Sequence, residues 1–308
     1  MPQRVVIIAD PGIDTAFAVA LALNDASLDV LALLATPGNV AADQATQNVH
    51  TLIEQLDPPR WPRLGAAPPV VYEIDGTDFH GPGGLGGMTF PGVKKHTTVA
   101  SDKQLVELVR EFPRQITVIN LGPLTVLAHA LDRDPELPSL IERIVCLGGA
   151  WHEPGNASAV VEFHFACDPA SARRVLKCGA PVMLIPLDLS RKVLFSPSDL
   201  LNLPNPDSRT SQFLRQIVPF GIRATANRYG VEGFHLKDVL GVFSLARPSA
   251  VTTRQMYVDV ETRGEITRGM TVVDVRANST EKPNVHLGVG VDVSAVREYI
   301  DETLGRAP

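Results

Sequence analysis

The most informative segment of this chain for its fold is Val5-Val6-Ile7-Ile8-Ala9-Asp10-Pro11-Gly12-Ile13-Asp14-Thr15-Ala16. Residues 5–8 form an apolar run that predicts a buried strand, and the Ala- and Leu-rich run at 17–23 predicts a helix. Asp10 and Asp14 therefore stand on a strand-to-helix turn, which is where open α/β sheets bind ligands. Asp14 suits the free N–H groups of a helix start. Asp10 gains less there, so it needs a cation, a hydrogen-bonding ligand or a catalytic duty; the alternative is a helix cap beside a surface acid.

The alternation of strand-length apolar runs with helical segments continues through the first two thirds of the chain. Strands are predicted at 4–9, 28–36, 115–121, 143–147 and 181–187, and helices at 15–24, 42–56, 101–112, 124–132 and 169–177. Continuous Val, Ile and Leu runs separated by helices are typical of a parallel sheet covered on both faces. The predicted fold class is α/β, a doubly wound, mostly parallel sheet with helices on both faces, in a single domain over residues 1–308.

Other segments interrupt or follow this alternation. Residues 70–95 are rich in glycine and predict a long functional loop. The remaining predictions are a Pro/Asn/Asp-rich connection at 196–211, a helix at 212–229, a helix-like run at 239–246, an antiparallel addition to the sheet at 253–275, and a final helix at 293–304.

Composition limits the class of protein. Of 308 residues 44% are hydrophobic and 20% are charged, so a large core can form and disorder is not expected. The net charge of -6, without a Lys/Arg-rich run, argues against a nucleic-acid partner. No signal peptide and no apolar run of about 18 residues are expected, so no membrane partner is predicted. Cys146, Cys167 and Cys178 lie in apolar or small-residue contexts, which indicates buried thiols in a reducing compartment, the cytoplasm.

Polar side chains recur where predicted strands end. Asn39 follows one strand, Asn156 and Glu162 follow another, and Asp238 opens a late helical run. The carboxyl ends of parallel strands share one edge, so these residues would join Asp10 and Asp14 in one pocket. Such oxygens suit a hard cation and a polyhydroxylated ligand. Each residue alone has a plainer interpretation: Asn39 as a turn residue, Glu162 with His164 as the exposed side of a strand, Asp238 as a helix cap.

Taken in order, these motifs resemble the nucleoside hydrolase family, the calcium-dependent N-ribohydrolases. The resemblance covers essentially the whole chain and rests on Asp10-Pro11-Gly12-Ile13-Asp14, Gly38-Asn39, His80-Gly81, Gly84-Leu85-Gly86, Gly122-Pro123-Leu124-Thr125, Gly148-Gly149, Gly155-Asn156, Glu162-Phe163, Leu187-Asp188-Leu189-Ser190 and the stretch from Thr267 to Asp274. It implies a doubly wound sheet, a homodimer or homotetramer, a nucleoside substrate and bound Ca²⁺. The implied reaction, used in nucleoside catabolism and purine salvage, splits a ribonucleoside into base and ribose.

The resemblance also implies roles for individual residues. Asp10 would contact the metal and activate water, while Thr125, through its carbonyl, and Asp238 would be further metal ligands. The ribose hydroxyls would be held by Asp14, Asn39, Asn156, Glu162 and Asp238. The chemistry is consistent with these roles, because C–N cleavage passes through an oxocarbenium-like state. A carboxylate that takes a proton from water supplies the nucleophile.

Two acids of the family motif Asp-x-Asp-Pro-Gly-x-Asp-Asp are missing here. Ile8 stands in place of the first acid and Thr15 in place of the last, which is normally a metal ligand. Calcium affinity follows ligand charge and ligand count, so weaker binding than in typical members is expected. Thr15 could still contribute a hydroxyl or hold a bridging water.

Further departures concern the substrate side. Lys237 replaces a His that often protonates the leaving base, and His164 replaces an Asn that touches the ribose hydroxymethyl group. One hypothesis is that Lys237 supplies positive charge where calcium charge is reduced, so that the site works with weakly held calcium or none; the alternative is that Lys237 extends into solvent. His80 is expected to contact the base or to be simply exposed. Arg223, Tyr229 and His235 are further base-side predictions.

Two functions therefore compete. The first is an active nucleoside hydrolase, resting on the retained carboxylates and amides. The second is a non-hydrolytic or altered-substrate ribosyl-binding relative with a weakened or absent calcium site, resting on Ile8, Thr15 and Lys237. A calcium-binding structural protein is a third, disfavoured by the ribose-gripping amides. The first is the prediction, and substitution of Asp10 by Asn discriminates it, since turnover should fall while the fold stays intact.

Overall fold

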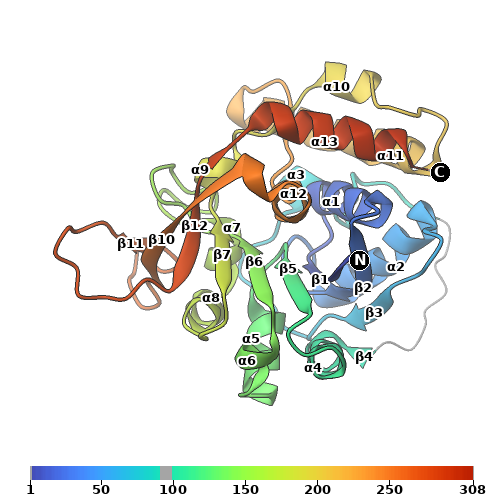
Figure 1. Cartoon of the computed structure of the whole chain (residues 1–308). Helices are drawn as coiled ribbons and strands as arrows, with labels where there is room; N and C mark the ends of the chain where they lie inside the picture. The colour runs from blue at the N-terminus through green and yellow to red at the C-terminus, as the bar shows by residue number, and fades with distance from the viewer. Residues whose placement is uncertain (1, 91–98, 308) are drawn as a thin grey trace.

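A computed structural model describes residues 2–90 and 99–307, and a ten-stranded sheet crosses it in the order β11-β10-β12-β7-β6-β5-β1-β2-β3-β4 (Figure 1). From β12 to β4 all neighbours are parallel, whereas β10 is antiparallel to both β12 and β11. The strands are β1 Gln3–Ala9, β2 Leu28–Ala35, β3 Arg63–Ala66, β4 Val99–Ala100, β5 Ile116–Asn120, β6 Arg143–Leu147, β7 Val182–Ile185, β10 Val251–Val260, β11 Thr271–Asp274 and β12 Val285–Val291. A separate antiparallel pair joins β8 Leu194–Phe195 to β9 Phe234–His235.

Helices cover both faces of the sheet (Figure 1). One layer holds α1 Ile13–Asn24, α2 Ala42–Leu56, α11 Arg209–Tyr229, α12 Val239–Ala246 and α13 Val293–Gly305. The other holds α4 Ser101–Glu111, α5 Thr125–Arg133, α6 Leu137–Leu140 and α8 Pro169–Leu176. Short helices are α3 Thr77–His80, α7 Phe163–Cys167, α9 Leu187–Ser190, α10 Pro197–Leu201 and the 3₁₀ turn Pro248–Ala250.

Strand β1 shows why both faces are covered. Side chains alternate across a strand, so Val5 and Ile7 enter the core on the α1 side while Val6 and Ile8 enter the core on the α5 side. All four are fully buried. A run without polar alternation is therefore the pattern required of a central parallel strand.

The chain changes direction across the sheet at β1. From β1 it proceeds outward through β2, β3 and β4, and it then returns to β5 on the other side of β1. The carboxyl ends of β1 and β5 are therefore the topological switch point, where open α/β sheets bind ligands. Gly38 and Gly122 lie against Asp10 at this point, and a β carbon on either would clash with that side chain.

The fold-class prediction is confirmed, with local corrections. All five predicted strands and all the predicted helices exist, with ends that differ by up to three residues. The prediction of a plain connection at 196–211 is wrong. A capping box at Ser196 starts α10, and α11 already begins at Arg209. The predicted loop at 70–95 contains the short helix α3, and its residues 91–95 lie outside the described residues. The sequence pattern does not predict β3, β4, β8, β9 or β12.

The described helices include none long and apolar enough to cross a membrane. Cys146, Cys167 and Cys178 are all free thiols, the first two buried and the third half-buried. Burial raises the pKa of the Cys146 and Cys167 thiols. These cysteines therefore pack as small hydrophobic side chains, as their sequence context predicts.

Candidate active site

Asp10 directly follows β1 and is fully buried. Its Oδ2 accepts the backbone N–H of Asn39 at 3.2 Å, and the Asn39 side-chain amide donates to the Asp10 carbonyl at 2.9 Å. Its Oδ1 has no hydrogen-bond partner among the described residues. A buried carboxylate oxygen without a partner is costly unless a ligand, ion or water supplies one. The free Oδ1 of Asp10 is therefore suited to contact a ligand, an ion or a water molecule.

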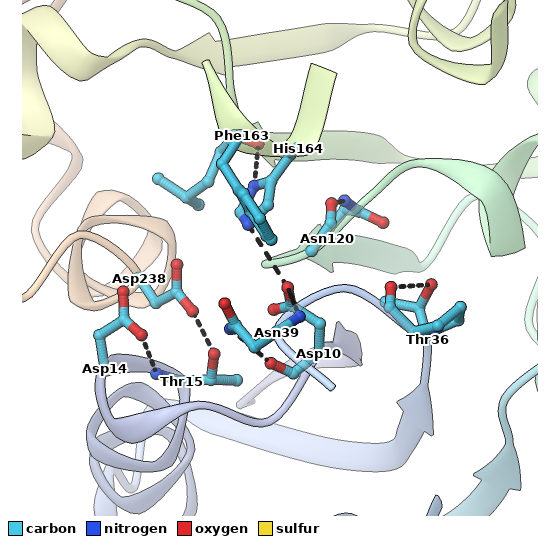
Figure 2. Close-up of polar contacts among 12 residues, drawn as sticks. Asp10, Asp14, Thr15, Thr36, Asn39, Asn120, Phe163, His164 and Asp238 are labelled. Carbon is cyan, nitrogen blue, oxygen red and sulfur yellow. Dashed lines mark hydrogen bonds and ion pairs between the residues drawn. The ribbon is translucent and has the colours of Figure 1, made fainter. Parts of the chain in front are cut away.

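Two further carboxylates lie close to Asp10. Figure 2 shows Asp14 and Asp238 gathered on the same side of the site, at the start of α1 and before α12. Burial raises the pKa of Asp10 well above the usual Asp value, and the negative charges of Asp238 and Asp14 raise it further. Burial and Asp14 raise the pKa of Asp238 in the same way. The site therefore favours a proton or another positive charge.

Thr15 occupies the position of the missing acid and points at Asp238. Its hydroxyl donates to Asp238 Oδ2 at 2.5 Å, and its backbone N–H donates to Asp14 Oδ1 at 3.1 Å (Figure 2). Asp238 makes no side-chain cap of α12, so its interpretation as a helix cap is wrong. Thr15 instead holds the two carboxylates in place through the first turn of α1.

Glu162 and His164 do not lie on a strand, which corrects their interpretation as its exposed side. Glu162 caps α7 by accepting the Phe165 N–H at 3.2 Å, and it also accepts the Gly149 N–H at 3.1 Å. Both Glu162 and His164 are buried. Glycines 148 and 149 interrupt the strand pattern before this segment, and the capping carboxylate favours a helix start.

His164 faces the Asp10 carboxylate. Its Nδ1 lies 3.1 Å from the Leu147 carbonyl and its Nε2 lies 3.6 Å from Asp10 Oδ2 (Figure 2). A carbonyl can only accept, so Nδ1 carries a hydrogen and the Nε2 atom is directed toward Asp10. The His164 ring therefore faces Oδ2 of Asp10, the same oxygen that accepts the Asn39 N–H.

A cavity of about 180 Å³ opens beside these groups. Most of the predicted substrate-binding residues line it: Asp14, Asn39, Asn156, Glu162, His164, Lys237 and Asp238. Asn156 is held by its Oδ1, which accepts the Phe163 N–H at 2.8 Å. The sequence reasoning missed Asp75, Asp78 and Phe79, which border the cavity from the glycine-rich segment and α3. No pattern in that segment distinguishes them from ordinary loop residues.

A second cavity, of about 360 Å³, adjoins the first. It shares Phe79, Asn156 and Lys237 with the first cavity, and His80, Tyr229 and His235 also line it. Lys237 therefore does not simply extend into solvent, and Arg223, which is exposed, lines neither cavity.

His80 is buried rather than exposed, which excludes the plainer alternative for that residue. Its Nδ1 accepts the Ile13 N–H at 3.0 Å, so its hydrogen is on Nε2. Burial lowers its pKa to about 4 and keeps the ring neutral at neutral pH.

Thr125 uses its side chain for structure. Its hydroxyl donates to Asp168 Oδ2 at 2.7 Å and lies 2.6 Å from the Tyr72 hydroxyl. This chain of contacts ties the segment carrying Tyr72 to the end of β5 and to the start of α8. Tyr72 is a second residue that sequence reasoning missed, because nothing local marks a tyrosine in a loop as a tether.

The predicted metal ligands do not fit a Ca²⁺ shell of the usual charge. Within residues 2–90 and 99–307, no group of three or more His, Cys, Asp and Glu side chains is arranged to hold a metal ion. Asp10 Oδ1 is available, but the Thr15 hydroxyl donates to Asp238, and Thr125 would contribute only a neutral backbone carbonyl. Two carboxylates and neutral oxygens form a poorer donor set than calcium sites with three or more carboxylates.

Known proteins of this fold and length resemble the whole chain. A probable uridine nucleosidase 2 from Oryza sativa subsp. japonica is 33% identical over 317 residues, covering 99% of this chain and 94% of the relative. A non-specific ribonucleoside hydrolase RihC from Salmonella enteritidis is 30% identical and covers 99% of this chain and 98% of its own. A solved plant nucleoside hydrolase superposes with a TM-score of 0.92 at 30% identity, covering 100% of both chains.

Fold, pocket and relatives together define an N-glycosyl hydrolase that cleaves ribonucleosides into base and ribose. The binding-only alternative is not favoured. The chain belongs to the inosine-uridine preferring nucleoside hydrolase family, whose model matches residues 5–298.

Proposed function

We propose that Asp10 is the general base of ribonucleoside hydrolysis in this protein. The observation that carries the proposal is its Oδ1, buried at the switch point of the sheet and bonded to no described group. Burial and neighbouring acids raise the pKa of Asp10, which makes its carboxylate a better proton acceptor. Asn39 fixes the other oxygen and the backbone, so the free oxygen is held in one direction.

The first cavity, bounded by carboxylates and amides, would take the ribose. Sugar hydroxyls donate to carboxylates and exchange hydrogen bonds with amides, so Asp14, Asn39, Asn156, Glu162 and Asp238 suit them. His164 lines the same cavity and would contact the ribose hydroxymethyl group, and its Nδ1 anchor to Leu147 keeps the ring fixed. Held in this way, the sugar is positioned before the reaction.

The reaction balances with the groups present. Water attacks C1′ and gives one proton to Asp10, while the C1′–N bond breaks and its electron pair goes to the base nitrogen. Positive charge develops on the sugar in the transition state. The negative carboxylates around the first cavity stabilise this positive charge and so lower the free energy of the transition state.

We also propose that this protein depends on Ca²⁺ less strongly than typical members of the family. The donor set formed by Asp10, Asp238, Thr15 and Thr125 supports Ca²⁺ held weakly or not at all. Calcium, when bound, would supply positive charge beside Asp10. Of these four residues Asp238 lines the first cavity, and the cationic side chain of Lys237 lines it as well.

We also propose a cellular location and an assembly for this protein. The free cysteines support a reducing compartment, and we assign the cytoplasm. Exposed apolar side chains near edge strand β11 support a homodimer or homotetramer: Ile266, Val272 and Val275 are 83%, 46% and 65% exposed. Light scattering of the purified chain gives the mass of the assembly, and a monomer at micromolar concentration would contradict this part.

The function is tested by measuring ribose release from uridine, inosine, cytidine and adenosine, with added Ca²⁺ and with a chelator. We expect release from at least one nucleoside by the wild-type chain and loss of release in Asp10→Asn. Release that survives the chelator supports the weak-calcium part of the proposal, and strict dependence on calcium contradicts it. If the wild-type chain releases no ribose from any nucleoside, the proposed function is wrong.

A further inference from the structure

The two adjoining cavities have opposite charge. Acidic side chains on the first include Asp14, Glu162 and Asp238. Among the described residues that line the second there is no Asp or Glu, whereas Arg191 and Lys237 are cations. A bond that lies across the boundary would therefore have one end among carboxylates and the other end among positive charges.

Lys237 lies on the boundary itself, because it lines both cavities. Within the described part of the chain its ammonium group makes no hydrogen bond and no ion pair within 4.0 Å. Arg191 is different, since its guanidinium donates to the Pro154 and Gly155 carbonyls at 2.8 and 3.0 Å and pairs with Glu153 at 3.2 Å. Lys237 is therefore the uncommitted cation of the second cavity.

The histidines of the second cavity are poor proton donors. Burial lowers the pKa of both His80 and His235 to about 4, so each ring is neutral at neutral pH. For His235 the charges of Lys237 and Arg191 act in the same direction. A neutral imidazole N–H can donate a hydrogen bond but does not give up its proton readily. Neither His80 nor His235 is therefore suited to protonate a leaving group in this cavity.

The walls of the second cavity suit a planar group. The rings of Phe79 and Tyr229 are stacked, with centroids 5.6 Å apart and planes at 15°, and Val231 and Phe234 add apolar surface. Arg228 covers Phe79 at 5.4 Å and pairs with Asp78 at 3.0 Å, which fixes that ring to the end of α11. Flat, rigid aromatic surfaces of this kind bind planar ligands.

We propose that the second cavity takes a planar leaving base that departs as an anion, and that Lys237 is the fixed positive charge that stabilises it. This inference rests on the proposed function and adds its substrate class: ribosides whose bases are stable as anions, as uracil is, rather than bases that need protonation to leave. The electron pair of the C1′–N bond goes to the base nitrogen beside Lys237. The base anion takes its proton from solvent after it leaves, and Asp10 releases the proton it took from water to solvent before the next cycle begins.

The test compares two ribosides with different leaving groups. In 4-nitrophenyl β-D-ribofuranoside the phenolate leaves readily as an anion, whereas the uracil of uridine is a poorer leaving group. Lys237→Met keeps the length of the side chain and removes its charge, and Lys237→Arg keeps the charge. Lys192→Met is the matched control, because Lys192 is exposed and lines neither cavity.

We expect Lys237→Met to lower kcat/KM for uridine about 100-fold and for the nitrophenyl riboside less than about 10-fold, since removal of one transition-state electrostatic contact costs about 10²–10³. Lys237→Arg retains most of the uridine rate and Lys192→Met retains all of it. An equal loss on both substrates, or an unchanged uridine rate in Lys237→Met, overturns the inference.

A binding measurement separates this inference from the proposed function. Orotate is a planar pyrimidine with a permanent negative charge next to the nitrogen that ribose would occupy, and its binding needs no turnover. By calorimetric titration, we expect orotate to bind wild type at least about 10-fold more tightly than Lys237→Met, with neutral uracil changing little. Equal orotate affinities overturn the role of Lys237 even in an active enzyme. Absence of ribose release with a retained orotate difference overturns the proposed function alone.

Discussion

The hydroxyl of Thr15 donates a hydrogen bond to Asp238 Oδ2 at 2.5 Å, across 223 positions of sequence. At this position the family motif has an acid, and an acid would repel Asp238 instead of donating to it. Together with the bond from the Thr15 N–H to Asp14, the contact therefore stabilises the Asp14 and Asp238 carboxylates, which would otherwise face each other without a cation. It is the feature of the site that departs most clearly from a calcium-binding design.

Thr15→Asp should tighten calcium binding. The substitution adds a negative charge and up to two oxygens beside Asp10 and Asp238, and calcium affinity rises with ligand charge. We expect the Kd for Ca²⁺ to fall at least about 10-fold, equivalent to about 1.4 kcal/mol. Isothermal titration of the purified protein measures this directly, without reference to activity.

Thr15→Asn is the matched control for that experiment, because it changes the hydroxyl to an amide and adds no charge. It should leave the Kd within about 3-fold of wild type, which is small beside a 1.4 kcal/mol effect. In the presence of a chelator Thr15→Asp should unfold at a lower temperature than wild type, since it adds an unpaired buried acid. An unchanged calcium affinity in Thr15→Asp would mean that position 15 does not face the ion.

Asp10→Asn should lower turnover by about 10²–10⁴-fold, the range expected when a general base is removed. The amide keeps the size of the side chain but cannot accept the proton of the attacking water. Circular dichroism should show an intact fold. Asp132→Asn, at an exposed position on the last turn of α5, should leave turnover unchanged. Turnover in Asp10→Asn close to that of wild type would remove Asp10 from the reaction.

The rate should fall on the acid side at a pH above the usual Asp range. The pKa of Asp10 is raised by burial and by Asp238 and Asp14, and the base must be deprotonated to accept a proton. Activity therefore rises with pH through that raised pKa. Asp238→Asn removes one of the raising charges, so the acid limb of kcat/KM should move to lower pH. A limb that stays in place would show that the two carboxylates do not interact.

The ionisation of Asp10 and Asp238 should also affect folding stability, but stability should fall as pH rises, whereas activity should increase. A carboxyl whose pKa is raised in the folded state contributes stability below its unfolded pKa and loses that contribution as pH rises through the folded value. As pH rises toward neutral, the wild-type protein should therefore lose folding stability that the Asp238→Asn variant does not lose. Thermal unfolding should give Asp238→Asn the higher melting temperature at pH 7, by about 2–4 °C per kcal/mol, with the difference shrinking as pH falls. A difference that grows at low pH would contradict the raised pKa of Asp238.

Tyr72→Phe should loosen the segment that borders the first cavity. The Tyr72 hydroxyl lies 2.6 Å from the Thr125 hydroxyl, and Ile74 and Asp75 of the same segment line the cavity. Loss of one hydrogen bond costs about 0.5–1.5 kcal/mol of unfolding free energy. We also expect KM to rise while kcat stays within about 3-fold, since Tyr72 positions a wall of the site and its hydroxyl bonds to Thr125, not to Asp10. Equal changes in kcat and kcat/KM would instead place Tyr72 in the chemical step.

Much of the fold could be predicted from local pattern. A strand without polar alternation must be buried on both sides, so the run at Val5 to Ile8 predicts the central parallel strand that the structure contains. Strands β3 and β4 escaped prediction because they are four and two residues long. Strand β12 escaped because glycines at 288 and 290 weaken its apolar pattern.

Local patterns predict the central parallel strands, the turn from β1 to α1 that carries Asp10 and Asp14, and the polar residues that follow other strands, since these depend on periodicities of two and 3.6 residues. Three relationships come from tertiary packing alone: Thr15 meets Asp238, His164 faces Asp10 from a helix, and Lys237 stands between an acidic and a basic cavity. Those relationships join residues far apart in the chain, and local patterns do not fix which distant side chains meet. Packing fixes them, because each of these side chains is held by contacts from a different element of the fold.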